Sequence, residues 1–303
     1  MVIGKLSTPL IIYVPGLLPK PRPDEHRDAL SRCLLASVRR FDEGIAEQIA
    51  ASEDNFRIVP WTFDFYGSHR EMKLDAAAID ELLMKQVASE EDVAVASSWK
   101  RRLGLWIYRL GDLLPFLIPH LASERMEVHL RDLLRYVNNE RGIAERIRYK
   151  LKTPLRQAAA AGRPVLLIGH SMGSVIAWDT LWQMTHRDND TAEVDLLLTM
   201  GSPLGQNYIQ KRIKGTDHHG AARFPSNIRQ WKNVSAVGDL TAIVPYLVND
   251  FGVMQEHGLQ SLEDERIFTW FRLDGVLNVH SEYGYLAHEA TARIVCDWWR
   301  SLS

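Results

Sequence analysis

The chain has 303 residues, 46 % of them apolar, and its formal net charge is −2. This length suits one large α/β domain or two small ones, and the small net charge argues against a dedicated nucleic-acid binder. Its two cysteines, Cys33 and Cys296, are too few for a disulfide framework, which favours a reducing compartment.

The N-terminal residues predict no targeting segment. Their apolar run is short, and Pro9 and Pro15 interrupt it, so the run does not fit a signal peptide. No uninterrupted apolar stretch of the sequence reaches the length of a membrane span. We therefore expect a soluble, cytoplasmic protein.

Short apolar and β-branched runs predict the strands of one sheet. The first run covers residues 10–14, Leu-Ile-Ile-Tyr-Val, and ends at Pro15-Gly16. A continuous apolar run of this kind is typical of a parallel strand that is buried on both faces. Further strands are expected over residues 56–65, 165–168, 195–200, 231–237 and 266–272.

Helical patterns separate these strands. A helix is expected from about Asp24 to Phe41, where a leucine or valine recurs every fourth residue, and a final helix from Leu286 to Trp299. Strands that alternate with helices predict an α/β protein whose central sheet is mostly parallel and carries helices on both faces.

Residues 67–155 separate the second strand from the third by more than one crossover helix needs. We expect a predominantly helical insertion here, within a single domain of residues 1–303. Its segment 99–121 is rich in large apolar residues and opens with a basic cluster. The segment fits a cap whose apolar lining accepts an acyl chain, or else a pair of buried helices with solvated basic faces. Contact with anionic lipid is a less favoured alternative.

The most informative motif is Gly169-His170-Ser171-Met172-Gly173, which lies between an apolar strand and a helical pattern. It fits the G-x-S-x-G nucleophile elbow, a sharp strand-to-helix turn that raises a serine hydroxyl above the sheet. The two glycines allow a tight turn and a close approach of the backbone. We therefore predict that Ser171 is a nucleophile. The alternative is a glycine-rich turn with an inert serine.

A serine nucleophile needs a general base and a carboxylate that orients this base. Asp239 directly follows the predicted strand 231–237, and Gly238 allows the chain to bend there, so we predict Asp239 as the acid. Asp274 is the alternative acid. His280 lies in the loop between the last strand and the last helix, where we expect the base.

The other histidines fit other roles. His288 lies off the apolar face of the last helix, where we expect a solvated side chain. His170 is expected to shape the elbow, because neighbouring side chains of the turn point apart. His218 and His219 fall in a polar loop without the spacing of metal ligands, and we expect no metal there.

Two backbone N–H groups are predicted to stabilise an oxyanion. One belongs to Met172, directly after the nucleophile, and the other to Leu17, in the loop after the first strand. Gly16 leaves space where the substrate must pass. Each donor would lower the barrier by roughly 3 kcal/mol.

With these residues placed, the chain resembles the serine lipase and esterase branch of the α/β-hydrolase superfamily. The likeness rests on the motif at 169–173, on Gly238-Asp239 and on His280. In addition, residues 199–205 are similar to the strand end that helps to wall the active site of many lipases. The likeness covers most of the chain apart from about residues 67–155.

The sequence departs from the family pattern at two positions. The oxyanion loop begins with Pro15-Gly16 where many members have His-Gly, and Ser174 stands where a further glycine is common. Neither change removes a backbone donor.

The resemblance implies hydrolysis of a small-molecule carboxylic ester through an acyl-enzyme, without a metal or an organic cofactor, and the apolar insertion suggests a hydrophobic or lipid-like substrate. A thioesterase or an acyltransferase would use the same three residues. A non-catalytic binding protein on this fold would usually lack one of them.

Overall fold

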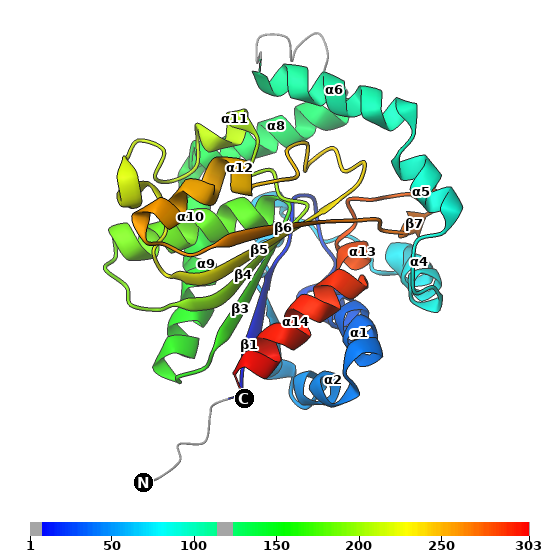
Figure 1. The fold of residues 1–303 in the computed structure, drawn as a ribbon, viewed down its shortest axis with the longest axis horizontal. Helices are drawn as coiled ribbons and strands as arrows, with labels where there is room; N and C mark the ends of the chain where they lie inside the picture. Colours follow the sequence, from blue (N-terminus) through cyan, green and yellow to red (C-terminus); the bar gives the residue numbers. More distant parts are fainter. Residues whose placement is uncertain (1–7, 114–123, 303) are drawn as a thin grey trace.

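The computed structural model of the chain describes residues 8–113 and 124–302. Within these residues, six parallel strands form one sheet in the order β2-β1-β3-β4-β5-β6 (Figure 1). The strands are β1 (Leu10–Val14), β2 (Phe56–Ile58), β3 (Val165–His170), β4 (Val194–Met200), β5 (Ile228–Ala236) and β6 (Leu262–Ile267). Next to this sheet, β7 (Arg272–Leu273) and β8 (Val276–Leu277) form a small antiparallel hairpin.

Helices connect the strands and cover the sheet. In chain order they are α1 (Pro23–Phe41), α2 (Glu43–Ala50), α3 (Thr62–Tyr66), α4 (Lys73–Met84), α5 (Glu90–Ala96), α6 (Trp99–Leu113), α8 (Glu124–Val137), α9 (Ile143–Ala160), α10 (Met172–His186), α11 (Asn207–Gln210), α12 (Val248–Phe251), α13 (Glu282–Leu286) and α14 (Glu289–Ser301).

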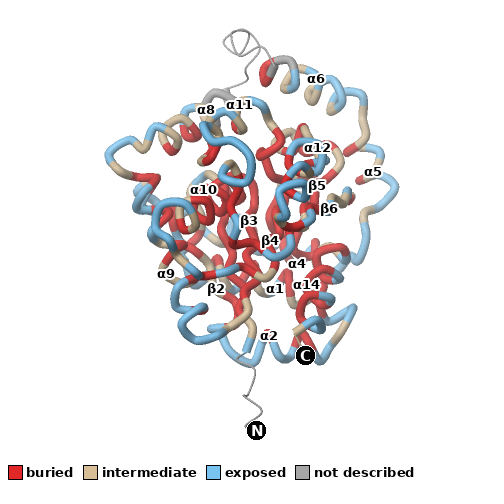
Figure 2. The backbone as a smooth tube through the Cα atoms, turned by 60° about the vertical axis from the view of Figure 1, so that its left-hand side comes forward, coloured by how far each residue is buried: buried red, intermediate tan, exposed pale blue. Residues whose placement is uncertain are grey.

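The two faces of the sheet have separate apolar cores, because successive side chains of a strand point to opposite faces. In β1, Ile11 and Tyr13 belong to the core that contains α1, α2 and α14. Leu10, Ile12 and Val14 belong to the core of α9 and α10. Figure 2 shows buried residues concentrated along the strands and on the helix sides that face them. The prediction of an α/β protein with helices on both faces of a parallel sheet is therefore confirmed.

The second strand is shorter than predicted. It ends at Ile58 rather than near residue 65, and the chain turns into α3 instead. Pro60 explains the early end, because a proline has no N–H to donate to a neighbouring strand.

The last strand of the sheet was predicted too late in the chain. β6 covers Leu262–Ile267, whereas residues 272–273 pair in the small hairpin. β6 has the sequence Leu-Glu-Asp-Glu-Arg-Ile, and only its first and last residues are buried. It lies at the edge of the sheet, where charged side chains protect an exposed strand, so a search for apolar runs misses it.

The final helix is divided in two. α13 ends at Leu286, and α14 begins after His288, whose Nδ1 accepts a hydrogen bond from the N–H of Ala290 at 3.0 Å. The expectation of a solvated His288 was therefore wrong. Burial lowers the pKa of this imidazole to about 4, which keeps it neutral and able to accept the hydrogen bond.

The region of the predicted insertion contains α4, α5, α6, α8 and most of α9. α9 packs against α10 and belongs to the core on one face of the sheet. α6 lies across the carboxyl ends of the strands, because Arg101 donates to the carbonyl of Gly238 and Arg109 to that of Ile243 (Figure 1). Residues 114–121 of the predicted apolar segment fall outside the described residues.

None of the helices in the described part of the chain combines the length and the apolar character that crossing a membrane requires.

The strand order reverses direction between β1 and β3. From β1 the chain crosses to β2 on one side, and from β2 it returns to β3 on the other side of β1. In open α/β sheets, ligands bind in the crevice that such a reversal opens at the carboxyl ends of the strands. The loop after β1 and the turn after β3 both lie at these carboxyl ends, where Gly16 of the loop packs against Ser171 of the turn.

Glycine at position 173 allows the first turn of α10 to lie directly on the end of β1. A Cβ added to Gly173 would stand 2.0 Å from the carbonyl oxygen of Val14. No side chain fits in that space, so the close approach requires glycine.

We expect Gly173→Ala to lower the free energy of unfolding by about 3 kcal/mol or more, because α10 must move away from β1. Urea unfolding followed by circular dichroism measures this loss. Gly44→Ala is the matched control. An added Cβ at this exposed position in α2 meets only Asp42 Oδ1, at 3.5 Å, so the change should stay within about 1 kcal/mol. Equal unfolding midpoints for the two variants would contradict the close approach.

Candidate active site

Ser171 occupies a strained turn between β3 and α10. Its backbone has φ 52° and ψ −125°, a region that residues other than glycine rarely adopt. Several hydrogen bonds hold this conformation. The N–H of Ser171 donates to the carbonyl of Met200 at 2.9 Å, and Ser174 donates to the carbonyl of Ser171 from its N–H at 3.0 Å and from its hydroxyl at 2.6 Å. Ser174 thus reinforces the turn.

Asp239 and His280 are hydrogen-bonded to each other. His280 Nδ1 lies 2.8 Å from Asp239 Oδ2, and the carboxylate is 1 % exposed. Asp239 also accepts hydrogen bonds from the Tyr285 hydroxyl and from the N–H of Thr241, both at 2.8 Å. Burial alone would raise the pKa of Asp239, but the charge and hydrogen bond of His280, together with the other two donors, lower it. The carboxylate therefore stays ionised and fixes the imidazole with Nδ1–H toward it.

The end of β4 contacts both the turn of Ser171 and the pair formed by Asp239 and His280. The carbonyl of Met200 accepts a hydrogen bond from the N–H of Ser171, and the next residue, Gly201, lies against the acid and the imidazole. A Cβ added to Gly201 would stand 2.9 Å from Asp239 Oδ2 and 3.1 Å from His280 Nδ1. The structure thus brings the three residues predicted from the sequence together around two consecutive positions of one strand end.

Ser171 Oγ and His280 Nε2 are not joined by a hydrogen bond. His280 Nε2 lies 3.4 Å from Thr241 Oγ1, and Ser171 Oγ has no hydrogen-bond partner within the described ranges. The imidazole is half-buried, with 32 % of the side chain exposed. Catalytic hydrogen bonds are often long or absent without substrate, so this geometry is compatible with a base that turns toward the serine.

The two predicted oxyanion donors flank Ser171. Met172 begins α10, where the first N–H groups of a helix have no partner within the helix. The loop residue Gly16 packs on the serine, because an added Cβ would stand 2.8 Å from Ser171 Cβ and 3.3 Å from its Oγ. Next to it, the N–H of Leu17, like that of Met172, donates to no other group among the described residues. The Tyr66 hydroxyl holds this loop by accepting from the N–H of Leu18 at 3.0 Å.

His170 lies beneath the site and contacts His280 through the backbone. Its Nε2–H donates to the carbonyl of His280 at 3.0 Å, and the two rings are 4.8 Å apart. Burial, together with the nearby His280, lowers the pKa of His170 to about 3, so this imidazole is neutral near pH 7. The side chain is placed to hold the His280 loop, whereas the sequence predicted a role in shaping the elbow.

Glu282 links the His280 loop to the first strand, a contact that sequence reasoning missed. The carboxylate is buried and accepts hydrogen bonds from the Tyr13 hydroxyl at 3.1 Å, Lys20 Nζ at 2.8 Å and His26 Nε2 at 2.9 Å. Burial alone would raise the pKa of Glu282, but Lys20 and His26 bring it well below its usual value. The only local signal was a charged residue in an otherwise apolar run, Tyr-Gly-Tyr-Leu, two positions after His280.

The remaining candidates lie elsewhere. Asp274 occupies the exposed turn between β7 and β8, whereas the imidazole of His280 is bonded to Asp239. The ring of His218 packs on Trp182, and His219 precedes a short exposed turn. In the described part of the chain, no group of three or more histidine, cysteine or acidic side chains is placed to hold a metal ion.

No protein-family model, curated protein or solved structure matches this chain. What the site does must therefore follow from its own residues.

Replacing Glu282 with glutamine should lower the free energy of unfolding at pH 7 by about 3 kcal/mol, because Lys20 would lose its buried counter-charge. The pKa of Glu282 is lower in the folded than in the unfolded protein, where it is near 4.5. Its contribution to stability is therefore complete above pH 4.5 and is lost as the pH falls through the folded pKa. The wild type and the variant should accordingly converge in stability below pH 4.5.

Urea unfolding between pH 3 and pH 7 tests this expectation. Glu193→Gln serves as the control, because Glu193 pairs with Arg229 at the surface and should contribute less than about 1 kcal/mol. A loss in Glu282→Gln that stays constant over the whole pH range would refute the charge network.

Proposed function

We propose that this protein is a serine hydrolase that cleaves a carboxylic ester, with Ser171 as nucleophile, His280 as general base and Asp239 as the orienting acid. The observation that carries the proposal is the 2.8 Å contact between His280 Nδ1 and a buried, ionised Asp239, beside a serine held at φ 52° at the carboxyl end of β3. A buried carboxylate that accepts Nδ1–H leaves Nε2 as the basic nitrogen of the imidazole.

The proposed reaction begins when His280 turns from Thr241 toward Ser171. Ser171 Oγ attacks the ester carbonyl and passes its proton to His280 Nε2. The tetrahedral oxyanion accepts hydrogen bonds from the N–H groups of Leu17 and Met172. The intermediate then expels the alcohol, which takes the proton from His280. Water, activated by the same nitrogen, hydrolyses the acyl-enzyme and releases the acid.

The surroundings support the division of roles between the two histidines. His170 Nε2 donates to the backbone of His280, and a pKa of about 3 makes the ring too weak a base near pH 7. α10 begins at Met172, so the positive end of its dipole favours negative charge at the site.

We also propose that the fold is that of the α/β-hydrolases. The three residues follow the chain order serine, acid, histidine, which is that of α/β-hydrolases. The serine follows β3, the acid follows β5, and the histidine comes after β6 and the small hairpin. α6, which Arg101 and Arg109 tether to the loop that carries Asp239, would act as a cap over a hydrophobic substrate.

Ser171→Ala should retain its fold and lose turnover of p-nitrophenyl esters by about 10⁴-fold to 10⁶-fold, because no other group supplies the attacking oxygen. Asp239→Asn should lose about 10⁴-fold, since the imidazole is no longer held in the productive tautomer. Initial rates across a series of acyl chain lengths measure both effects. Ser226→Ala, at an exposed position, is the control and should match the wild type. Unchanged turnover in Ser171→Ala would end the proposal.

The same assay with acyl-CoA substrates separates the related activities. Faster turnover of thioesters than of oxygen esters would reassign the protein as a thioesterase. Product esters formed from an added alcohol, in preference to free acid, would indicate an acyltransferase.

A further inference from the structure

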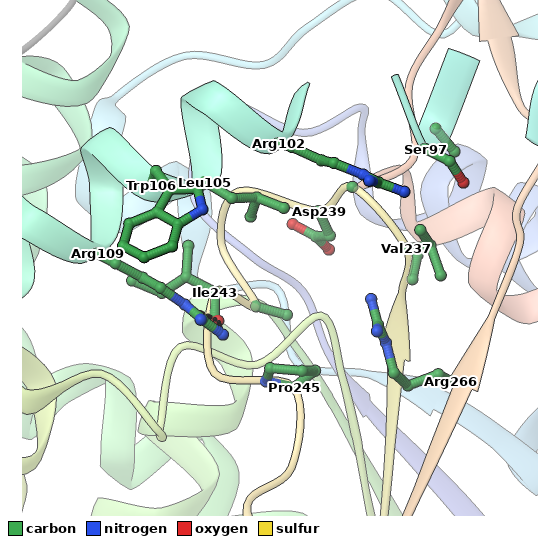
Figure 3. A pocket seen from close by; sticks show the side chains of 14 residues that line it. Ser97, Arg102, Leu105, Trp106, Arg109, Val237, Asp239, Ile243, Pro245 and Arg266 are labelled. Carbon is green, nitrogen blue, oxygen red and sulfur yellow. Dashed lines mark hydrogen bonds between the residues drawn. The ribbon is translucent and has the colours of Figure 1, made fainter. Parts of the chain in front are cut away.

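A recess lies beside the proposed acid, between α6 and the loop over residues 237–245 (Figure 3). Its volume is about 300 Å³, at the lower end of the range for small-ligand pockets. Asp239 lines it, but Ser171 and His280 do not, so the recess adjoins the proposed site on the side of the acid and does not contain the proposed nucleophile. Its apolar wall consists mainly of Leu105, Trp106, Val237, Ala242, Ile243 and Pro245.

The charged side chains that line the recess are three arginines and one acid. Arg102 and Arg109 come from α6, Arg266 comes from β6, and the acid is Asp239. Among the described residues, Asp239 forms no ion pair with these three arginines; its oxygens accept hydrogen bonds from His280 and two other donors. The recess therefore carries an excess of positive charge.

Two of the arginines form no ion pair with another described residue. Within the described ranges, neither Arg102 nor Arg266 makes a side-chain hydrogen bond or an ion pair, although Arg266 stands 6.0 Å from the ring centre of Tyr246. Arg109, by contrast, donates from Nε and Nη2 to the carbonyl of Ile243. Figure 3 shows Arg102 reaching in from α6 and Arg266 from the strand on the opposite side, with Asp239 between the two elements. Both arginines remain exposed, so an anion from solution can reach them.

We propose that this recess binds a small amphiphile with a single anionic group, a carboxylate or a phosphate. Guanidinium groups favour such groups, because their fork of N–H donors matches two oxygens of the anion. Arg102 and Arg266 hold the anionic group, while the apolar part packs against Leu105, Trp106 and Ile243. The bound molecule contacts both α6 and the loop that carries Asp239, so it fastens the helix to the loop.

Calorimetric titration of the full chain with octanoate and with octyl phosphate tests the site and tells its two headgroup chemistries apart. Binding of at least one of them is expected. It should weaken at least tenfold in Arg102→Gln/Arg266→Gln, which loses both guanidinium groups. Octanol, which has no charge, and inorganic phosphate, which has no tail, should bind at least tenfold more weakly than the better amphiphile.

The control variant Arg22→Gln/Lys85→Gln removes two positive charges at exposed positions outside the recess and should bind as the wild type does. A Ser171→Ala variant should also bind normally, because the site does not depend on hydrolysis. Failure of the proposed hydrolysis would therefore leave this binding result unaffected. Equal affinity in Arg102→Gln/Arg266→Gln and the wild type, or no binding of either amphiphile, would overturn the proposal.

Discussion

The proposed chemistry depends on keeping a negative charge on Asp239, whose side chain is buried. Burying a carboxylate without partners is costly, and the group would respond by taking up a proton. Here His280, Tyr285 and the backbone of Thr241 surround it with donors. Tyr285 is itself fixed, because its hydroxyl accepts from the N–H of Ala236 at the end of β5. The orientation of the imidazole thus derives from the sheet rather than from a flexible loop.

The proposed site also depends on close backbone packing around Ser171. The end of β1, the turn of Ser171 and the start of α10 meet so tightly that Gly16 and Gly173 have no space for a Cβ. This packing sets the positions of the N–H groups of Leu17 and Met172 relative to the serine hydroxyl. The strain at Ser171 is tolerated because Met200 and Ser174 hold its backbone from both sides.

The parts of the site that the sequence predicts are those encoded locally. The glycine spacing around Ser171, between an apolar run and a helical pattern, predicts a tight strand-to-helix turn, and the structure has that turn. Asp239 and His280 were predicted from their places after apolar runs, and the structure pairs them. Their catalytic roles stay predictions, as does the apolar cap.

The parts that could not be predicted depend on partners far apart in the chain. Glu282 is hydrogen-bonded to Tyr13, which lies 269 positions away in the sequence, and no local pattern predicts such a pair. Nothing in the sequence around Tyr285 or Thr241 predicts that these residues donate hydrogen bonds to Asp239. The edge strand β6 was misplaced for a related reason, because its charged sequence fits its position at the edge of the sheet and not an apolar run.

The most direct test of the central claim is labelling with a fluorophosphonate probe, followed by mass mapping of the adduct on the wild type and on Ser171→Ala. An activated serine attacks the phosphorus and displaces fluoride, so the account predicts an adduct on Ser171 in the wild type and none in the variant. A folded wild-type protein that carries no adduct at Ser171 would contradict the account, and a binding role for the fold would take its place.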